Sequence, residues 1–198
     1  IFVPERGMTN NKLILKQAEG TLQTYLNPVR LKKINTESLK PYPDLVKEDL
    51  DVLLNAERFG ITGKKVKILS KQTPYDPDDK SSVYIIFSVE GCHSLSSTLD
   101  KSRISKDEII KNIDEIADKY PLVSVNVTHL EQYPFCNHAY GIQFITNEDF
   151  RPTGNRISDD GLAIIRHCYA RDIMIDIKHL SLASRRMLIE DVRNRPDF

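Results

Sequence analysis

The sequence predicts an α/β fold built on a parallel sheet, and three observations support this prediction. From residue 44 onward the pattern reads helix, strand, strand, helix, strand, helix, strand, helix. Helices between strands return the chain, so the strands they join run parallel. One strand candidate is apolar almost throughout, as in a buried parallel strand. The composition, 40% hydrophobic and 28% charged over 198 residues, fits one globular domain.

The first half of the chain divides into four predicted segments. Residues 1–42 carry several prolines and little periodicity, so we expect irregular structure around one or two short helices. Residues 44–59 place leucines at helical spacing, and Gly60 is a natural helix end. Residues 65–69 alternate apolar and polar side chains and predict a short strand. Residues 71–82, rich in Pro and Asp, predict a loop.

The stretch Val83–Val89 is the strongest strand signal in the chain, and Glu90-Gly91 follows it directly. A continuous apolar run of this length predicts a strand buried on both faces. Burying an unpaired carboxylate is costly, so we expect Glu90 to have a partner, either a metal ion or a cation. The alternative is that Glu90 ends the strand and points to water.

The second half alternates helices and strands. Ser105 and Glu108 form a capping-box pattern before a helix that ends near Tyr120. Residues 122–128 predict a strand, and residues 131–154 a long loop.

Two further helices and one strand complete the pattern. Ser158 is the expected N-cap of a helix that runs to Arg171. Residues 173–177 predict a strand, and Ser181 caps a last helix that runs through Arg193.

Charge and cysteine content exclude several classes of protein. Lys+Arg and Asp+Glu both total 28, and this balance argues against a dominant surface for nucleic acid or anionic membrane. No apolar run approaches the roughly 18 residues that span a bilayer. Cys92, Cys136 and Cys168 are odd in number and far apart, which predicts reduced thiols rather than a disulfide framework or a thiolate zinc site. Reduced thiols favour the cytoplasm, and the compartment is otherwise open.

Three predicted strands end in side chains that bind metals or move protons: Glu90, His129 and His179. The C-terminal ends of parallel strands meet at one rim, so residues dispersed over 90 positions converge in one pocket. Imidazole and carboxylate together suit zinc and its neighbours. The sequence therefore predicts a divalent metal site at this rim.

The other histidines have weaker cases. His93 follows Glu90 closely, and we favour a structural hydrogen-bonding role over support of a metal ligand. His138 either lines the pocket or faces solvent. His167 lies inside a predicted helix and is interpreted as a surface or packing residue.

Asp176, Arg151 and Arg156 are further candidates. Asp176 either orients a ligand or pairs structurally, and its position in the alternation of the strand favours structural pairing. Arg151 and Arg156 are candidates to bind a substrate carboxylate, although surface arginines are common.

Three blocks resemble the renal (membrane) dipeptidase family, metal-dependent relatives of the amidohydrolases. Phe87–Leu99, FSVEGCHSLSSTL, resembles its VEGGHS segment, and Val125–Phe135, VNVTHLEQYPF, resembles its LTLTH strand and following loop. Gly161–Ser181, GLAIIRHCYARDIMIDIKHLS, resembles its helix–strand unit ending in DLSHVS. The blocks keep the family's order and lie within residues 83–190.

This resemblance implies a (β/α)8 TIM barrel with two zinc ions at the C-terminal rim. Glu90 would bridge both metals, and His179 would bind one of them. His129 would contact the substrate and stabilise charge on its carbonyl oxygen. The implied reaction is hydrolysis of the amide bond of a dipeptide, or another small amide, by a metal-bridging hydroxide.

The chain departs from the family pattern in several places. It contains no HxD pair, which the family has on its first strand, and Phe198 comes before the family's later metal-binding His. Cys92 replaces a Gly, and Lys178 stands where a small residue is common.

We therefore expect an incomplete barrel, an internal portion of a longer one. In this interpretation 1–198 is a single domain whose residues 43–198 supply barrel units. A further barrel segment or a second copy of the chain would cover its open edge. The alternatives are a non-catalytic barrel relative acting as a binding or interaction module, and another amidohydrolase-type enzyme acting on an ester, lactone or phosphoester.

Overall fold

The computed structural model of the protein describes residues 42–56, 63–98, 100–140, 151–152, 154 and 156–194. Its elements, in chain order, are α4 (Tyr42–Asn55), β1 (Lys65–Ile68), β2 (Ser82–Ile85), β3 (Phe87–Val89), η2 (Cys92–Leu95), η3 (Lys101–Arg103), α5 (Lys106–Lys119), β4 (Leu122–Val125), α6 (Asp159–Ala170), β5 (Met174–Ile175) and α7 (Leu182–Arg193). The predicted helix end at Gly60 and the irregular segment over 1–42, Tyr42 apart, lie outside the described residues.

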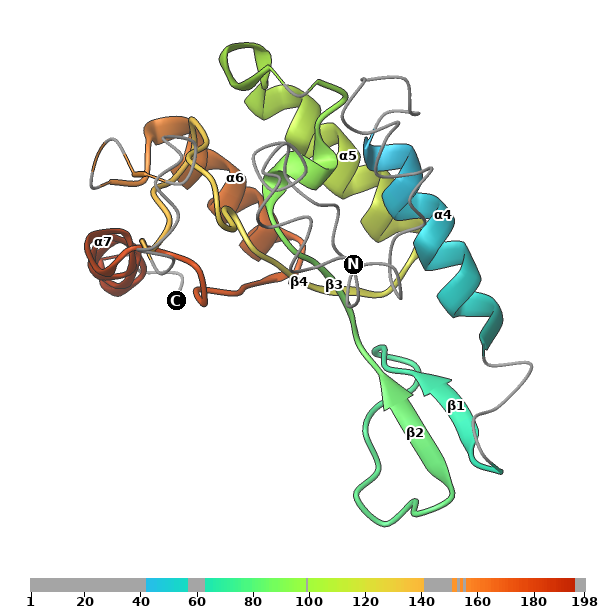
Figure 1. Ribbon diagram of the computed structural model, residues 1–198. Coiled ribbons are helices and arrows are strands. Elements are labelled where there is room, and N and C mark those ends of the chain that lie inside the picture. Colours follow the sequence, from blue (N-terminus) through green and yellow to red (C-terminus); the bar gives the residue numbers. More distant parts are fainter. Residues whose placement is uncertain are drawn as a thin grey trace.

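The strands form two small parallel sheets. β1 pairs with β2 (Figure 1), and the second sheet has the order β3–β4–β5. This arrangement confirms the predicted α/β class and parallel pairing. Among the described residues the strands do not close into a barrel (Figure 1).

The apolar run Val83–Val89 is not the single buried strand that we predicted. It divides into β2 and β3, which belong to different sheets, and Ile86 at the division is 56% exposed. β2 pairs only with β1 among the described strands, and all four of its residues are half-buried. β3 alone has the expected burial, with Phe87 and Val89 inside the core.

Helices α5 and α6 lie side by side against the β3–β4–β5 sheet, and α4 packs beside η2 (Figure 1). The apolar face of α5 is fully buried through Ile109, Ile113 and Ile116. On the same face the buried Asn112 donates its side-chain N–H to the carbonyl of Leu95 at 2.8 Å. This hydrogen bond ties α5 to η2, the turn that follows Glu90.

Two of the three predicted helix caps are confirmed. The Ser158 hydroxyl accepts from the Gly161 N–H at 3.1 Å at the start of α6, and Ser181 accepts from the Ser184 N–H at 3.1 Å at the start of α7. These bonds satisfy N–H groups that have no partner within the helix.

The predicted capping box at α5 does not form. Ser105 occupies the N-cap, but its side chain makes no capping hydrogen bond. Glu108 turns to the preceding loop instead, where its carboxylate accepts from the Ser97 N–H at 3.0 Å and the Ser96 hydroxyl at 3.4 Å. The carboxylate therefore fastens the loop after η2 onto α5.

The three cysteines are free thiols buried in the core, as the sequence predicts. Burial raises the pKa of Cys136 to about 11 and that of Cys168 to about 12. Both groups are therefore protonated thiols at neutral pH.

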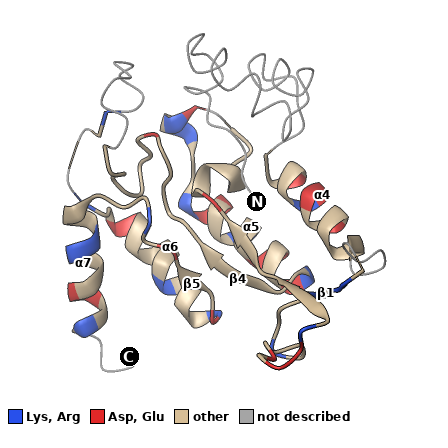
Figure 2. Cartoon of the chain, turned by 60° about the horizontal axis from the view of Figure 1, so that its bottom comes forward, with Lys and Arg blue, Asp and Glu red and all other residues tan. Residues whose placement is uncertain are grey.

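Acidic and basic residues share the same helices, α7 among them (Figure 2). Within the described part of the chain, no helix combines the length and the apolar character that a membrane crossing requires.

Candidate metal centre

The register of the three-stranded sheet aligns the ends of its strands. Val89 pairs with Val125, which pairs in turn with Ile175. One further rung follows on each side, because Asn126 donates its N–H to Val89 and Asp176 donates its N–H to Val125, both at 3.0 Å. The hydrogen-bonded ladder is shorter than the predicted strands, and all three strands end at the same level of the sheet.

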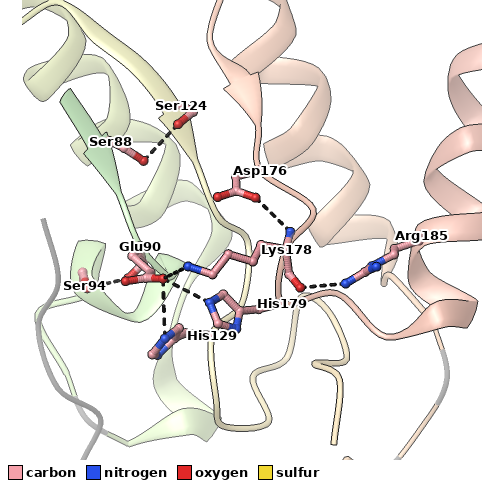
Figure 3. Close-up of polar contacts among 9 residues, drawn as sticks. All are labelled: Ser88, Glu90, Ser94, Ser124, His129, Asp176, Lys178, His179 and Arg185. Atoms are coloured by element: carbon pink, nitrogen blue, oxygen red, sulfur yellow. Dashed lines mark hydrogen bonds and ion pairs between the residues drawn. The ribbon is translucent and has the colours of Figure 1, made fainter. Parts of the chain in front are cut away.

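Glu90, His129 and His179 follow these aligned ends, and their side chains meet (Figure 3). Oε1 of Glu90 lies 3.0 Å from Nε2 of His179 and 3.6 Å from Nε2 of His129. The two imidazole rings meet edge to face with their centroids 4.3 Å apart. All three predicted site residues are therefore brought together.

The donor set and its spacing fit a divalent metal ion. The three ligand atoms all lie within 4.8 Å of one another. Ligand atoms bound at about 2.0–2.1 Å around a tetrahedral ion are separated by roughly 3.3 Å, close to the separations measured from Glu90. One carboxylate and two imidazoles are a common ligand combination for zinc and neighbouring metals. These residues offer three donor atoms, of which the dipeptidase resemblance assigns those of Glu90 and His179 to the metal and that of His129 to the substrate.

An ion pair with a buried carboxylate holds the loop that carries His129. Glu131 is 1% exposed, and its carboxylate lies 2.9 Å from the Lys101 ammonium. The Thr128 hydroxyl donates to the Glu131 carbonyl at 3.2 Å. Lys101 also lies over the Tyr133 ring, 5.5 Å from its centroid. His129 thus projects from a loop held on both sides, and its side chain is 9% exposed.

His93 packs behind the cluster. Its ring stacks on Tyr133 with centroids 5.2 Å apart and faces His129 at 6.5 Å. The ring fits because Gly91, at φ +87°, has no side chain, since a Cβ there would lie 2.4 Å from Nδ1 of His93. His93 is buried and also contacts the Ser94 hydroxyl at 3.4 Å, which agrees with the structural role predicted for it.

The backbone around His179 is held by the long loop before α6. The Ala139 N–H donates to the His179 carbonyl at 2.7 Å, and the Ser181 N–H donates to the Asn137 carbonyl at 3.0 Å. His138 forms an antiparallel bridge with Leu180 between them. His138 is therefore a buried residue of this brace, and the alternative that it faces solvent is wrong.

Lys178 is a partner of Glu90 that the sequence reasoning missed. Its ammonium lies 3.3 Å from Oε1, the same oxygen that both imidazoles face (Figure 3). Its backbone N–H donates to the Asp176 carboxylate at 2.8 Å, and its carbonyl accepts from Arg185 at 2.7 Å. Asp176 therefore has a structural pairing role, as favoured. The sequence did indicate that Glu90 needs a metal ion or a cation as its partner. It did not identify Lys178, because this residue lies in a turn, where the alternation of strand residues does not predict the direction of a side chain.

The surroundings shift the pKa values of two cluster residues. Burial disfavours the charged form of Glu90, but His129, His179 and Lys178 outweigh this effect and hold the pKa of the carboxyl below its usual value. Burial and the neighbouring His129 lower the pKa of His179. Glu90 is thus ionised and His179 neutral near pH 7, which are the forms that bind a metal.

Three other candidate residues make no contact with the cluster of Glu90, His129 and His179 among those that the structure describes. His167 on α6 contacts the Asp114 carboxylate on α5 at 2.7 Å, the surface role expected for it. Arg151 and Arg156 are both exposed. Arg156 lines a hollow of about 430 Å³ together with Tyr133, but no residue of the cluster lines this hollow.

A second hollow, of about 590 Å³, lies at the other end of the sheet. Its walls include Leu122 at the start of β4, Met174 at the start of β5, and Tyr75 from the loop between β1 and β2. The residues that line it include no histidine, glutamate or cysteine, and the one carboxylate among them, Asp172, pairs with Lys71. The cluster of Glu90, His129 and His179, by contrast, lies beyond the C-terminal ends of the strands, where α/β proteins place their chemistry.

A scan of family models and searches of curated proteins and of solved structures found no match to the chain. The resemblance of the three sequence blocks to the dipeptidase family therefore stays a prediction.

Proposed function

We propose that this protein is a metal-dependent hydrolase that cleaves the amide bond of short peptides. The observation that carries the proposal is the convergence of Glu90, His129 and His179 at aligned ends of parallel strands. A bound divalent metal lowers the pKa of a coordinated water and so supplies a nucleophile near neutral pH. Zinc is the metal that the donor set and the dipeptidase resemblance favour.

Each cluster residue has a distinct role in this proposal. Glu90 supplies the negative charge that a cation requires, and its ionised form is favoured by its surroundings. His179 supplies a neutral imidazole nitrogen beside it. His129 is held by a buried loop and faces the same space, where its ring can donate a hydrogen bond to charge that develops on a substrate carbonyl.

The three residues do not by themselves make the two-metal site that the resemblance implies. The sequence lacks the HxD pair, so the additional ligands of a complete site would come from a further barrel segment. We accordingly propose that this chain alone binds one metal ion and that hydrolysis requires the completed site.

The test is a zinc titration of the metal-free full chain, followed by assay of a dipeptide panel. We expect one bound zinc per chain, and strongly reduced binding in Glu90→Gln. His167→Gln is the matched control, since its imidazole also contacts a carboxylate but lies on α6. Equal zinc affinities for the wild type and Glu90→Gln, or measurable dipeptide hydrolysis at equal rates by both, would contradict the proposal.

A second candidate function is a non-catalytic binding module. The ammonium of Lys178 on Glu90 favours it, because the carboxylate then has a protein cation for a partner. The same titration separates the two candidates, since a binding module of this kind takes up no zinc.

A further inference from the structure

Lys178 and a metal ion need the same atom. The ammonium lies 3.3 Å from Oε1 of Glu90, and the imidazole of His179 lies 3.0 Å from that oxygen. A cation coordinated by Glu90 and His179 would occupy this space. The two positive charges repel one another, so the ammonium has to leave as the metal arrives.

The structure allows this movement without disturbing the loop. The backbone of Lys178 is held at both ends of the residue, by the Asp176 carboxylate and by Arg185. Its side chain, by contrast, is 65% exposed and has a flexible four-carbon stem. The ammonium can therefore swing away while His179 remains in place.

The contact that holds the ammonium on Glu90 is weak. Ion pairs between partly exposed side chains contribute little net stability, and the Glu90 side chain is itself 29% exposed. A divalent ion that gains the Glu90 carboxylate and the His179 imidazole has the stronger interaction, and displacement of the ammonium is the favoured outcome.

Resting on the proposed function, we propose that Lys178 determines substrate specificity: its ammonium, displaced from Glu90 by the metal, binds a carboxylate group of the substrate. Once the metal neutralises Glu90, the ammonium retains its charge and lies at the exposed side of the cluster. A metal and a lysine side by side attract anionic ligands and disfavour cationic ones. A short peptide supplies such a group in its terminal carboxylate.

The first experiment measures metal affinity alone. Zinc is titrated into the metal-free full chain of the wild type, Lys178→Met and Lys71→Met. Removing the competing ammonium should tighten zinc binding by about 5-fold, the upper range for such an ion pair. Lys71→Met is the matched control, because Lys71 also forms an exposed ion pair, with Asp172 at 2.7 Å, but at the opposite end of β5. It should leave the zinc affinity unchanged.

The second experiment measures ligand preference of the zinc-loaded protein. The probes are N-acetylglycine and its amide, which differ in the carboxylate. The wild type should bind the acid about tenfold more tightly than the amide, the range of a charge-assisted contact. Lys178→Met should lose most of this preference, whereas Lys178→Arg, which keeps the charge, should retain it.

The outcomes separate this inference from the proposed function. Absence of zinc binding in every variant overturns both. Zinc binding with equal affinity in the wild type and Lys178→Met, together with an unchanged acid-to-amide ratio, overturns the role of Lys178 and leaves the metal site standing. Circular dichroism of each variant verifies that it is folded.

Discussion

Nε2 of His179 lies 3.0 Å from Oε1 of Glu90, although 89 positions separate the two residues in the sequence. The contact exists because β3, β4 and β5 are parallel and in register, so their C-terminal ends lie at one level. Substitutions at either residue therefore test whether the side chains that this register brings together bind one metal ion.

Glu90→Gln should abolish most of the zinc affinity. The amide keeps the shape of the side chain but loses the charge that attracts the cation, and loss of a charged ligand should weaken binding by about 100-fold or more, about 2.7 kcal/mol. Isothermal titration calorimetry measures the change. An affinity within a factor of about three of the wild type would remove Glu90 from the site.

His129→Gln and His179→Gln should have different effects. Because His179 is assigned as a ligand, its replacement should lower zinc affinity by at least about tenfold. Because His129 is assigned to the substrate, its replacement should leave zinc affinity nearly unchanged and reduce the hydrolysis rate of the completed site by about 100-fold. Equal losses of zinc affinity would show instead that both imidazoles are ligands.

Gly91→Ala should destabilise the protein more than Gly63→Ala. Both glycines have positive φ, +87° and +79°, so both substitutions strain the backbone by about 1–3 kcal/mol. Only at Gly91 does the new methyl group also meet a side chain, Nδ1 of His93 at 2.4 Å, whereas nothing lies within 4 Å at Gly63. Urea unfolding compares the two variants, and equal losses would mean that His93 moves aside freely.

Stability should fall as the pH rises above about 9. Burial raises the pKa of Cys136 to about 11 and of Cys168 to about 12, from a usual value of 9.0. Between these values the unfolded chain loses thiol protons that the folded chain retains, so the free energy of unfolding decreases with pH. Cys168→Ala should make the decrease shallower, as measured by urea unfolding between pH 8 and pH 11. An unchanged slope would contradict the burial of this thiol.

Arg185→Ala should weaken metal binding without unfolding the protein. Arg185 donates to the carbonyls of Lys178 and Leu180, at 2.7 and 3.0 Å, on either side of His179. Losing both contacts loosens the ligand loop, and such supporting contacts are worth about 10-fold or more in affinity. The exposed neighbour Arg186 provides the control variant, Arg186→Ala. Equal zinc affinities for the two variants would exclude this supporting role.

The sequence predicted the site better than it predicted the sheet. Glu90, His129 and His179 were identifiable because each follows an apolar strand, and parallel strands bring such positions together. The division of the Val83–Val89 run was not identifiable, because both neighbours of Ile86 are apolar and no Gly or Pro marks the change of sheet. This division depends on strand pairing, which involves residues far apart in the sequence.

Local contacts explain the other differences. Glu108 has the right spacing to cap α5, but two donors of the folded loop, from Ser96 and Ser97, compete for its carboxylate and prevail. Lys178 was noted only as a departure from the dipeptidase pattern. Its direction depends on the turn that Asp176 makes with its backbone, which no periodicity reveals. The partial barrel and the extent of the single domain stay predictions.

β5 is two residues long, and among the described strands it pairs with β4 alone, leaving Met174 59% exposed. His179 thus depends on the outermost strand of the sheet. A further strand that paired with β5 and ordered it would raise the affinity of the site for metal. Bound metal would raise the affinity of β5 for that strand by the same factor. Binding of the metal ion and pairing of a further strand with β5 are in this way coupled equilibria.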